Sequence, residues 1–349
     1  MAGVPAIGNR GGSTATRGAE DLHDLLEQHR VELTAYAYRR LGSAFEAEDA
    51  VQETLLRAWK GFDGFEGRAA LRSWLYRILT NVCLDMLSGR ARRARPMDLG
   101  SAGTAEKHLL GERLPDVTWI EPIPDGQALP TGGDPAEMAE SRESIRLAFV
   151  AALQHLPARQ RAVLILREVL RWKASEVAEL LETSVPSVNS ALQRARATLA
   201  SADLETGEAR RPMDEEQRAL LARYVDAFER YDMDSLTSLL REDASWSMPP
   251  YELWLQTHDD VRQWCLGPGI GCRGSRLMPV EANGMPAYGQ YKPSDREGIL
   301  EPWSLQVVEV SGDRIAGITF FLDTQRLFPT FSLPPQLQRL ETDPGNGSG

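Results

Sequence analysis

Apolar residues recur every three to four positions along most of the first 200 residues, which is the spacing of amphipathic helices. Residues 47–60 carry one such stripe and residues 71–87 carry another. Residues 141–156 and 158–171 show the same spacing, interrupted by Pro157. The pattern predicts an all-α arrangement for this part of the chain. In the first helix we expect these residues to face the core: Ala47, Ala50, Val51, Leu55, Ala58 and Trp59.

Residues 174–199 predict two short helices joined by a tight turn. Val177 and the small Ala178 face inward in the first helix, and Ser184 stands where an N-cap belongs, with Pro186 in the first turn of the second helix. The outward positions of the second helix are polar, and Asn, Gln and Arg side chains pair with base edges in the major groove. The segment therefore predicts a DNA-reading helix-turn-helix, with these side chains outward: Ser187, Asn189, Ser190, Gln193, Arg194 and Arg196.

After residue 213 the pattern changes from helices to strands. Glu215–Tyr231 is an amphipathic stretch, and residues 233–248 read as a helix leading into a strand. Pro302–Asp323 holds two apolar or alternating runs joined at Ser311–Asp313, which predicts a β-hairpin. Helices followed by antiparallel strands indicate an α+β cone.

Charge adds a puzzle to this picture. The 349-residue chain carries a formal charge of −11. Residues 1–95 and 141–203 are weakly basic at +2 and +3, whereas residues 96–140 carry −7 and residues 204–349 carry −9. Residues 96–135, rich in proline, glycine and acid, indicate an extended linker with a short helix near Ala105–Arg113. Two basic modules, an acidic linker and an acidic third module suit a nucleic-acid binder with an appended part that does not touch DNA.

Several functional classes are disfavoured. No apolar run is long enough for a membrane span, and the N-terminal stretch lacks the apolar segment of a signal peptide, so we expect a cytoplasmic protein. Three scattered cysteines match neither a disulfide framework nor a zinc site. We expect no metal and no cofactor.

The first helical module holds further candidate chemistry. A glycine-rich loop at residues 61–70 carries two phenylalanines and an arginine, which suits stacking with unpaired bases. The helix after it ends in GRARRAR at residues 89–95, whose arginines would hold phosphates. The second helix is expected to show these side chains on its outer face: Arg72, Tyr76, Arg77 and Asn81.

Three motifs in order, DAVQETLLRAW, LRSWLYRILTNVCLDMLSGRARR and LPARQRAVLILREVLRWKASEVAELLETSVPSVNSALQRAR, resemble group IV, or extracytoplasmic-function (ECF), sigma-70 factors of bacterial RNA polymerase. The resemblance covers residues 21–203. It implies binding to core RNA polymerase, at the β′ clamp helices and the β flap, and to promoter DNA. It also implies that the acidic linker runs towards the active-site cleft and the RNA exit channel.

The resemblance assigns three groups of residues. Asp49, Gln52, Glu53, Arg57 and Trp59 are expected to bind polymerase. The −10 element is expected to meet Phe65, Arg68, Arg72, Trp74, Tyr76, Arg77, Asn81, Arg90, Arg92 and Arg93. The −35 element is expected to meet Ser184, Ser187, Asn189, Ser190, Gln193, Arg194 and Arg196. Since polymerase supplies most of the affinity of a sigma factor for DNA, the acidic net charge is no obstacle.

Two positions depart from the family pattern. Glu182 stands in the turn where relatives usually have glycine, and a positive φ there costs a non-glycine residue about 1 kcal/mol. Asn189 and Ala191 stand where relatives often carry Lys and Arg. The −35 sequence of a relative therefore does not transfer directly.

Residues 214–330 resemble the SnoaL-like (NTF2-like) domains fused to a subset of these sigma factors. A regulatory domain that packs on the sigma modules is the favoured interpretation, and a pocket for a small-molecule ligand is the alternative. His258 and Asp259 form a weak candidate acid–base pair, so we expect no catalytic residues and no enzyme. The residues proposed for a regulatory pocket or interface are Trp254, His258, Asp259, Asn283 and Tyr288.

The predicted organisation is multidomain: two all-α sigma modules and a C-terminal α+β cone. Two function classes compete: a sigma factor tuned by its C-terminal domain, and a one-component helix-turn-helix regulator whose C-terminal domain binds or converts a small molecule. The expected boundaries are a disordered lead-in (1–19), sigma region 2 (20–95), the acidic linker (96–135), sigma region 4 (136–203), a second linker (204–213), the SnoaL-like domain (214–332) and a tail (333–349).

Overall fold

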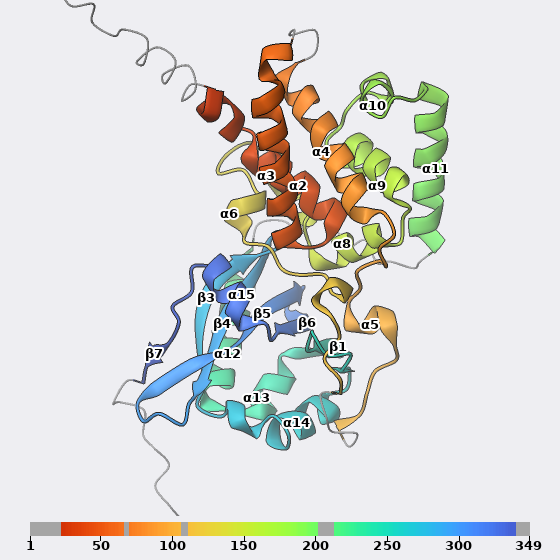
Figure 1. Ribbon diagram of the computed structural model, residues 1–349. Coiled ribbons are helices and arrows are strands. Elements are labelled where there is room, and N and C mark those ends of the chain that lie inside the picture. Colours follow the sequence, from red (N-terminus) through yellow and green to blue (C-terminus); the bar gives the residue numbers. More distant parts are fainter. Residues whose placement is uncertain (1–21, 66–69, 106–110, 202–212, 340–349) are drawn as a thin grey trace, which may run out of the picture.

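The computed structural model describes residues 22–65, 70–105, 111–201 and 213–339. The helices of residues 22–87 and 135–201 gather on one side of the molecule, and the sheet of the C-terminal domain lies on the other (Figure 1). The lead-in and most of the second linker lie outside the described residues, as do most of the predicted tail and of the predicted short helix near Ala105–Arg113.

The first helical module is built around helices α2, α3 and α4, and a short helical segment at residues 22–27 precedes them. Helix α2 ends at Gly42, whose φ of 72° gives a left-handed C-cap, and α3 begins after the N-cap Ser43. The apolar stripe of α3 is buried, as the periodicity predicts, except that Trp59 is 42% exposed and not in the core. The elements are α2 (Arg30–Leu41), α3 (Ala44–Gly61), the 3₁₀ turn η1 (Phe62–Gly64) and α4 (Leu71–Leu87).

The second helical module differs from the prediction at one place. The expected helix over 141–156 is two helices, broken at Ser144–Arg146, where Arg146 adopts an extended ψ of 145°. The next helix loosens into a π-helix, so that Leu170 N–H bonds to the Ile165 carbonyl. The elements are α7 (Pro135–Glu143), α8 (Leu147–Gln154), α9 (Ala158–Leu164), η4 (Ile165–Val169), α10 (Ala174–Leu180) and α11 (Val185–Ser201).

The C-terminal domain has the predicted α+β cone. Three helices lie on one face of a sheet of order β2-β1-β6-β5-β4-β3, and β7 pairs with β5. The predicted hairpin at Ser311–Asp313 is confirmed. Its helices are α12 (Glu215–Arg230), α13 (Met233–Ser238), α14 (His258–Leu266), η5 (Ile270–Cys272) and α15 (Thr324–Thr330). Its strands are β1 (Leu240–Ser247), β2 (Trp254–Leu255), β3 (Arg276–Ala282), β4 (Met285–Pro293), β5 (Ile299–Ser311), β6 (Arg314–Phe321) and β7 (Leu337–Gln338), the last of them within the predicted tail.

Both faces of the sheet are buried, in two different cores. One core lies between the sheet and α12, α13 and α14, and includes Tyr224 and Val308. The other core lies on the opposite face, and it includes Val307 and Phe328 together with the buried residues of both helical modules. The C-terminal domain is therefore packed on the helices through continuous apolar contact, which is the main determinant of its position.

The acidic linker is not the featureless extended segment that composition predicts. It holds α5 (Pro96–Leu99), η3 (Asp116–Thr118) and α6 (Asp125–Ala128), and it buries Trp119 and Ile123. Its backbone also forms two isolated β-bridges with neighbouring segments: Ala94 pairs with Trp119, and Pro124 pairs with Ala282. The linker therefore contacts both the helical part and the C-terminal sheet.

Candidate polymerase- and DNA-binding surfaces

The face of α3 opposite its buried stripe is open. Asp49, Gln52 and Arg57 are exposed, and Arg57 pairs with Glu53 one turn earlier at 2.7 Å. Trp59 lies at the end of this helix with a large exposed ring. Exposed aromatic and polar side chains on one helix face are typical of a protein-docking surface.

An aromatic cluster lies between α3 and α4. The Phe65 ring stacks on Trp74 with 4.9 Å between centroids, and Phe62 lies 5.9 Å from Phe65 on the other side. Arg68 lies outside the described residues. The three rings of the cluster are half-buried, and aromatic rings of this kind are the surfaces on which bases stack in single-strand binders.

The face of α4 meets the second helical module. Tyr76 was expected to point outward, and this expectation is wrong, because its side chain is fully buried and its ring lies 5.1 Å from that of Trp172. The Arg72 guanidinium lies over both rings and bonds to Glu32 at 2.7 Å. Arg77 approaches Glu179 of α10 at 3.7 Å, while Asn81 remains exposed. Part of the predicted −10 surface is therefore covered by the module predicted to bind the −35 element.

The arginines after α4 have acidic partners far away in the sequence. Arg93 is buried, pairs with Glu46 at 3.0 Å and donates to the Asp116 carbonyl at 2.9 Å. Arg90 also pairs with Glu46. Arg92 is exposed and contacts His155. The expectation that all of these arginines face phosphates is therefore wrong for Arg93, which anchors the linker.

The helix-turn-helix is present as the pattern predicts. Ser184 caps α11 by accepting a hydrogen bond from the Ser187 N–H at 3.3 Å, and Val188 is fully buried. Glu182 adopts φ of 50°, so the turn keeps the left-handed backbone without a glycine. Arg194 bonds to Ser190 at 2.8 Å, and Arg196 pairs with Glu168 at 2.6 Å. The remaining predicted −35 residues, Ser187, Asn189 and Gln193, are exposed on one helix.

The turn between β3 and β4 is buried at a three-way junction. Asn283 has φ of 57° and no solvent exposure. Its amide nitrogen donates to the Tyr38 hydroxyl at 2.6 Å and to the Ile145 carbonyl at 2.7 Å, and its amide oxygen accepts from Ile123 N–H at 3.1 Å. One side chain therefore joins α2, the linker and the start of α8 to the C-terminal domain.

Ion pairs surround this junction. Arg146 pairs with Glu309 of β5 at 2.5 Å, and Arg326 of α15 reaches Asp116 and Glu121 of the linker at 3.0 and 3.1 Å. Burial raises the pKa of Asp125 to about 6, although its carboxylate accepts the Gly284 N–H at 2.7 Å. The contact between the sheet and the helices is therefore polar as well as apolar.

The other C-terminal candidates have different surroundings. His258 contacts the Arg241 carbonyl at 2.9 Å, and the neighbouring Asp259 is exposed in the first turn of α14, which Thr257 caps. Trp254 donates to the Gly100 carbonyl of the linker at 3.0 Å. Since His258 bonds to backbone and no hydrogen bond joins it to Asp259, nothing favours a catalytic pair there. No group of three or more potential metal-ligating side chains occurs in the described parts of the chain.

The inside of the cone is filled by a hydrogen-bonded chain that sequence reasoning missed. Tyr224 donates to Gln306 at 2.6 Å, Gln306 donates to Gln290 at 3.0 Å, and Gln290 donates to Ser275 at 3.1 Å. Tyr288, the remaining candidate, lies beside Tyr224 with 6.0 Å between ring centroids. The sequence pattern could have indicated this chain, because polar residues such as Gln290 and Gln306 stand at inward positions of otherwise apolar strands.

Comparison with known proteins agrees with this geometry. The family pattern of sigma-70 region 2 matches residues 25–93, and that of sigma-70 region 4 matches residues 146–199. The two matches fall on the two helical modules. They define the class of protein as a sigma factor, and they favour it over a one-component regulator, which needs no region 2.

Individual relatives narrow the class. The ECF RNA polymerase sigma factor SigG of Mycobacterium tuberculosis is 45% identical over 94% of this chain and 88% of its own length. SigJ of the same species is 30% identical over 64% of this chain. The crystal structure of SigJ covers 90% of this chain and 100% of its own, with a TM-score of 0.56 and 21% identity. The chain belongs to the ECF group of the sigma-70 family.

None of the described helices is both long and apolar enough to cross a bilayer.

Proposed function

We propose that this sigma factor works in the cytoplasm, binds core RNA polymerase through the exposed face of α3, and reads promoter DNA through the Phe65–Trp74 cluster and α11. We further propose that its C-terminal domain holds the two sigma modules together and so limits access to polymerase and DNA. The observation that carries this second proposal is the buried Asn283 side chain, which bonds to both modules at once.

The packed arrangement is incompatible with simultaneous reading of both promoter elements. The −10 and −35 elements lie about 25 base pairs apart, which is roughly 85 Å at about 3.4 Å per base pair. Helix α11 packs on α10, and α10 packs on α4. Two helix–helix contacts of about 10 Å each separate the predicted readers by only ~20 Å. The modules must therefore separate before transcription begins.

Separation breaks contacts within the sigma part as well as those to the C-terminal domain. The Tyr76–Trp172 ring contact is lost, and so are the hydrogen bonds from Arg39 to Ser144. We call the arrangement in which the two sigma modules are packed together the closed state, and the arrangement in which they are apart the open state. The C-terminal domain bonds to both modules only when they are together, so its contacts stabilise the closed state alone. It therefore shifts the equilibrium towards that state.

Run-off transcription with core polymerase tests the proposal. A chain truncated after residue 205 is expected to be more active than the intact chain at limiting sigma concentration, because the contacts of the C-terminal domain are absent. Equal transcription across promoters contradicts the regulatory role. If both chains fail on every promoter while the intact chain binds duplex DNA alone, the assignment of polymerase and promoter contacts is lost.

A further inference from the structure

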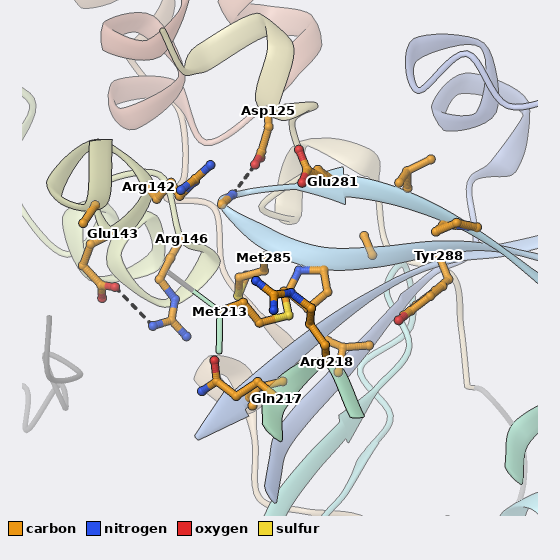
Figure 2. A pocket seen from close by; sticks show the side chains of 18 residues that line it. Asp125, Arg142, Glu143, Arg146, Met213, Gln217, Arg218, Glu281, Met285 and Tyr288 are labelled. Carbon is orange, nitrogen blue, oxygen red and sulfur yellow. Dashed lines mark hydrogen bonds and ion pairs between the residues drawn. The ribbon is translucent and has the colours of Figure 1, made fainter. Parts of the chain in front are cut away.

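A cavity of about 490 Å³ lies between the sheet and α7 (Figure 2). Arg142, Glu143 and Arg146 line it from the helical side, and Arg218 and Tyr288 line it from the C-terminal domain. Its volume lies within the range of about 300–1,000 Å³ that is usual for small-molecule sites. Both parts of the chain supply walls, so the cavity exists only while they are packed together.

The cationic side chains of this cavity are incompletely neutralised. Arg146 is buried and pairs with Glu143 at 3.2 Å and with Glu309, yet its Nε atom is buried without a hydrogen-bond partner. Among the described residues, the ion-pair partner of Arg218 is Glu215, in the same exposed helix turn. Arg142 has no acid within ion-pair distance in the described ranges, although its charge acts on Asp125 and lowers the pKa of that carboxyl against the larger effect of burial. An anion entering the cavity would meet the buried, unpartnered Nε atom of Arg146 on the helical side and the exposed guanidinium of Arg218 on the side of the C-terminal domain.

The acidic residues of the cavity oppose an anion only weakly. Glu143 is occupied by Arg146, and Glu281 is exposed at the rim. The Asp125 carboxylate is occupied by the Gly284 N–H at 2.7 Å, and because burial raises its pKa to about 6, its charge is lost only as the pH falls towards and below 6. The rest of the wall is largely apolar and includes Met213, Val280, Met285, Val308 and Val310.

We propose that this cavity binds an organic anion: a compound with one carboxylate, sulfonate or phosphate group and an apolar body. The anionic group lies among Arg142, Arg146 and Arg218, and the body lies against the methionines and valines. Since the ligand touches both parts of the chain, it stabilises the closed arrangement. The inference rests on the proposed function only in requiring that arrangement.

Fluorescence titration of the full-length chain with anilinonaphthalene sulfonate tests the site, and the uncharged phenylnaphthylamine serves as the matched probe. The double variant Arg142→Gln/Arg218→Gln is expected to bind the sulfonate at least about tenfold more weakly, with little change for the neutral probe. Arg223→Gln, an exposed change on α12 outside the cavity, is expected to leave both affinities unchanged. Unchanged sulfonate affinity in the double variant, or equal losses for both probes, would overturn the proposal.

A second variant and an independent measurement keep the interpretation separate from the proposed function. Val280→Trp fills the cavity and is expected to abolish binding of both probes, and retained binding contradicts the assigned location. Small-angle X-ray scattering reports whether the intact chain is compact. A compact chain that fails to distinguish the probes overturns the anion site alone, whereas an extended chain overturns the closed arrangement and the site together.

Discussion

The Asn283 amide nitrogen lies 2.6 Å from the Tyr38 hydroxyl oxygen, across 245 positions of sequence. Tyr38 in turn donates to the Glu121 carbonyl at 2.8 Å. A helix of region 2, the acidic linker and a turn of the C-terminal sheet therefore share one buried hydrogen-bonded chain. Buried groups of this kind are costly to leave unpaired, so the three segments separate together or stay together.

Asn283→Gly is expected to favour the open state. Glycine tolerates the left-handed backbone, so the change removes three side-chain hydrogen bonds without straining the turn. The loss is about 2–3 kcal/mol, or a roughly 30- to 150-fold shift of the equilibrium. Run-off transcription at limiting sigma should rise. Asp313→Ala, in the other hairpin turn, is the control. Unchanged or lower activity of Asn283→Gly argues against the role of Asn283 in holding the closed state together.

The raised pKa of Asp125 predicts that the stability of the closed state depends on pH. Because burial raises the folded-state pKa to about 6, the closed form binds more protons than the open form between about pH 4 and pH 6. Its stability is therefore greatest below this window and falls as the pH rises through 6, by roughly 1–3 kcal/mol in total. Limited proteolysis at pH 5 and pH 7.5 should show this change.

Asp125→Asn mimics the protonated carboxyl and still offers an oxygen to the Gly284 N–H. The variant is expected to resist proteolysis at pH 7.5 as well as the parent chain does at pH 5. A pH profile identical to that of the parent would assign the dependence to other groups.

Glu182→Gly is expected to stabilise the helix-turn-helix by about 1 kcal/mol, because glycine adopts a φ of 50° without steric cost. Glu179→Gly, three residues earlier inside α10, is the matched control, and it should destabilise by a similar amount. Denaturant titration of the two variants measures both signs. Destabilisation by both changes would mean that the Glu182 side chain has a stabilising contact.

Asn189→Ala and Gln193→Ala are each expected to reduce the free energy of binding to the −35 element by about 1–3 kcal/mol, and so to lower transcription from promoters with a defined −35 element. Both side chains are exposed on α11, so stability should not change. The affinity of the variants for core polymerase should stay constant, because binding to polymerase is a separate step from reading the −35 element. Ser175→Ala on α10 is the control, and equal effects of all three changes contradict direct reading.

Trp59→Ala is expected to weaken binding to core polymerase by about 1–2 kcal/mol, since exposed tryptophans frequently anchor interfaces. Lys60→Ala, at the neighbouring exposed position, should have a much smaller effect. Fluorescence anisotropy with labelled protein measures both. If Trp59→Ala bound core polymerase with wild-type affinity, the assignment of α3 to the docking surface would be wrong.

Local patterns predicted the elements well but not their partners. Ser184 and Pro186 were placed correctly because capping depends on neighbours within one helical turn. The break at Ser144–Arg146 was missed because the apolar periodicity continues through it, and the packing of Arg39 on Ser144 decides the bend. Tyr76 and Arg93 were misplaced for the same reason, because Trp172 and Glu46, their partners, are distant in sequence.

The sequence by itself determined two helical modules, an acidic linker, a cone with its hairpin, and the family to which the sigma part belongs. Periodicity, caps and motif order are local or additive, so they can be read without coordinates. Only the tertiary structure decided that Asn283 is a buried clasp, that Tyr76 is covered, and that an arginine-lined cavity lies between the domains. These features depend on pairing between residues more than 90 positions apart, and no local pattern specifies which distant surfaces become complementary.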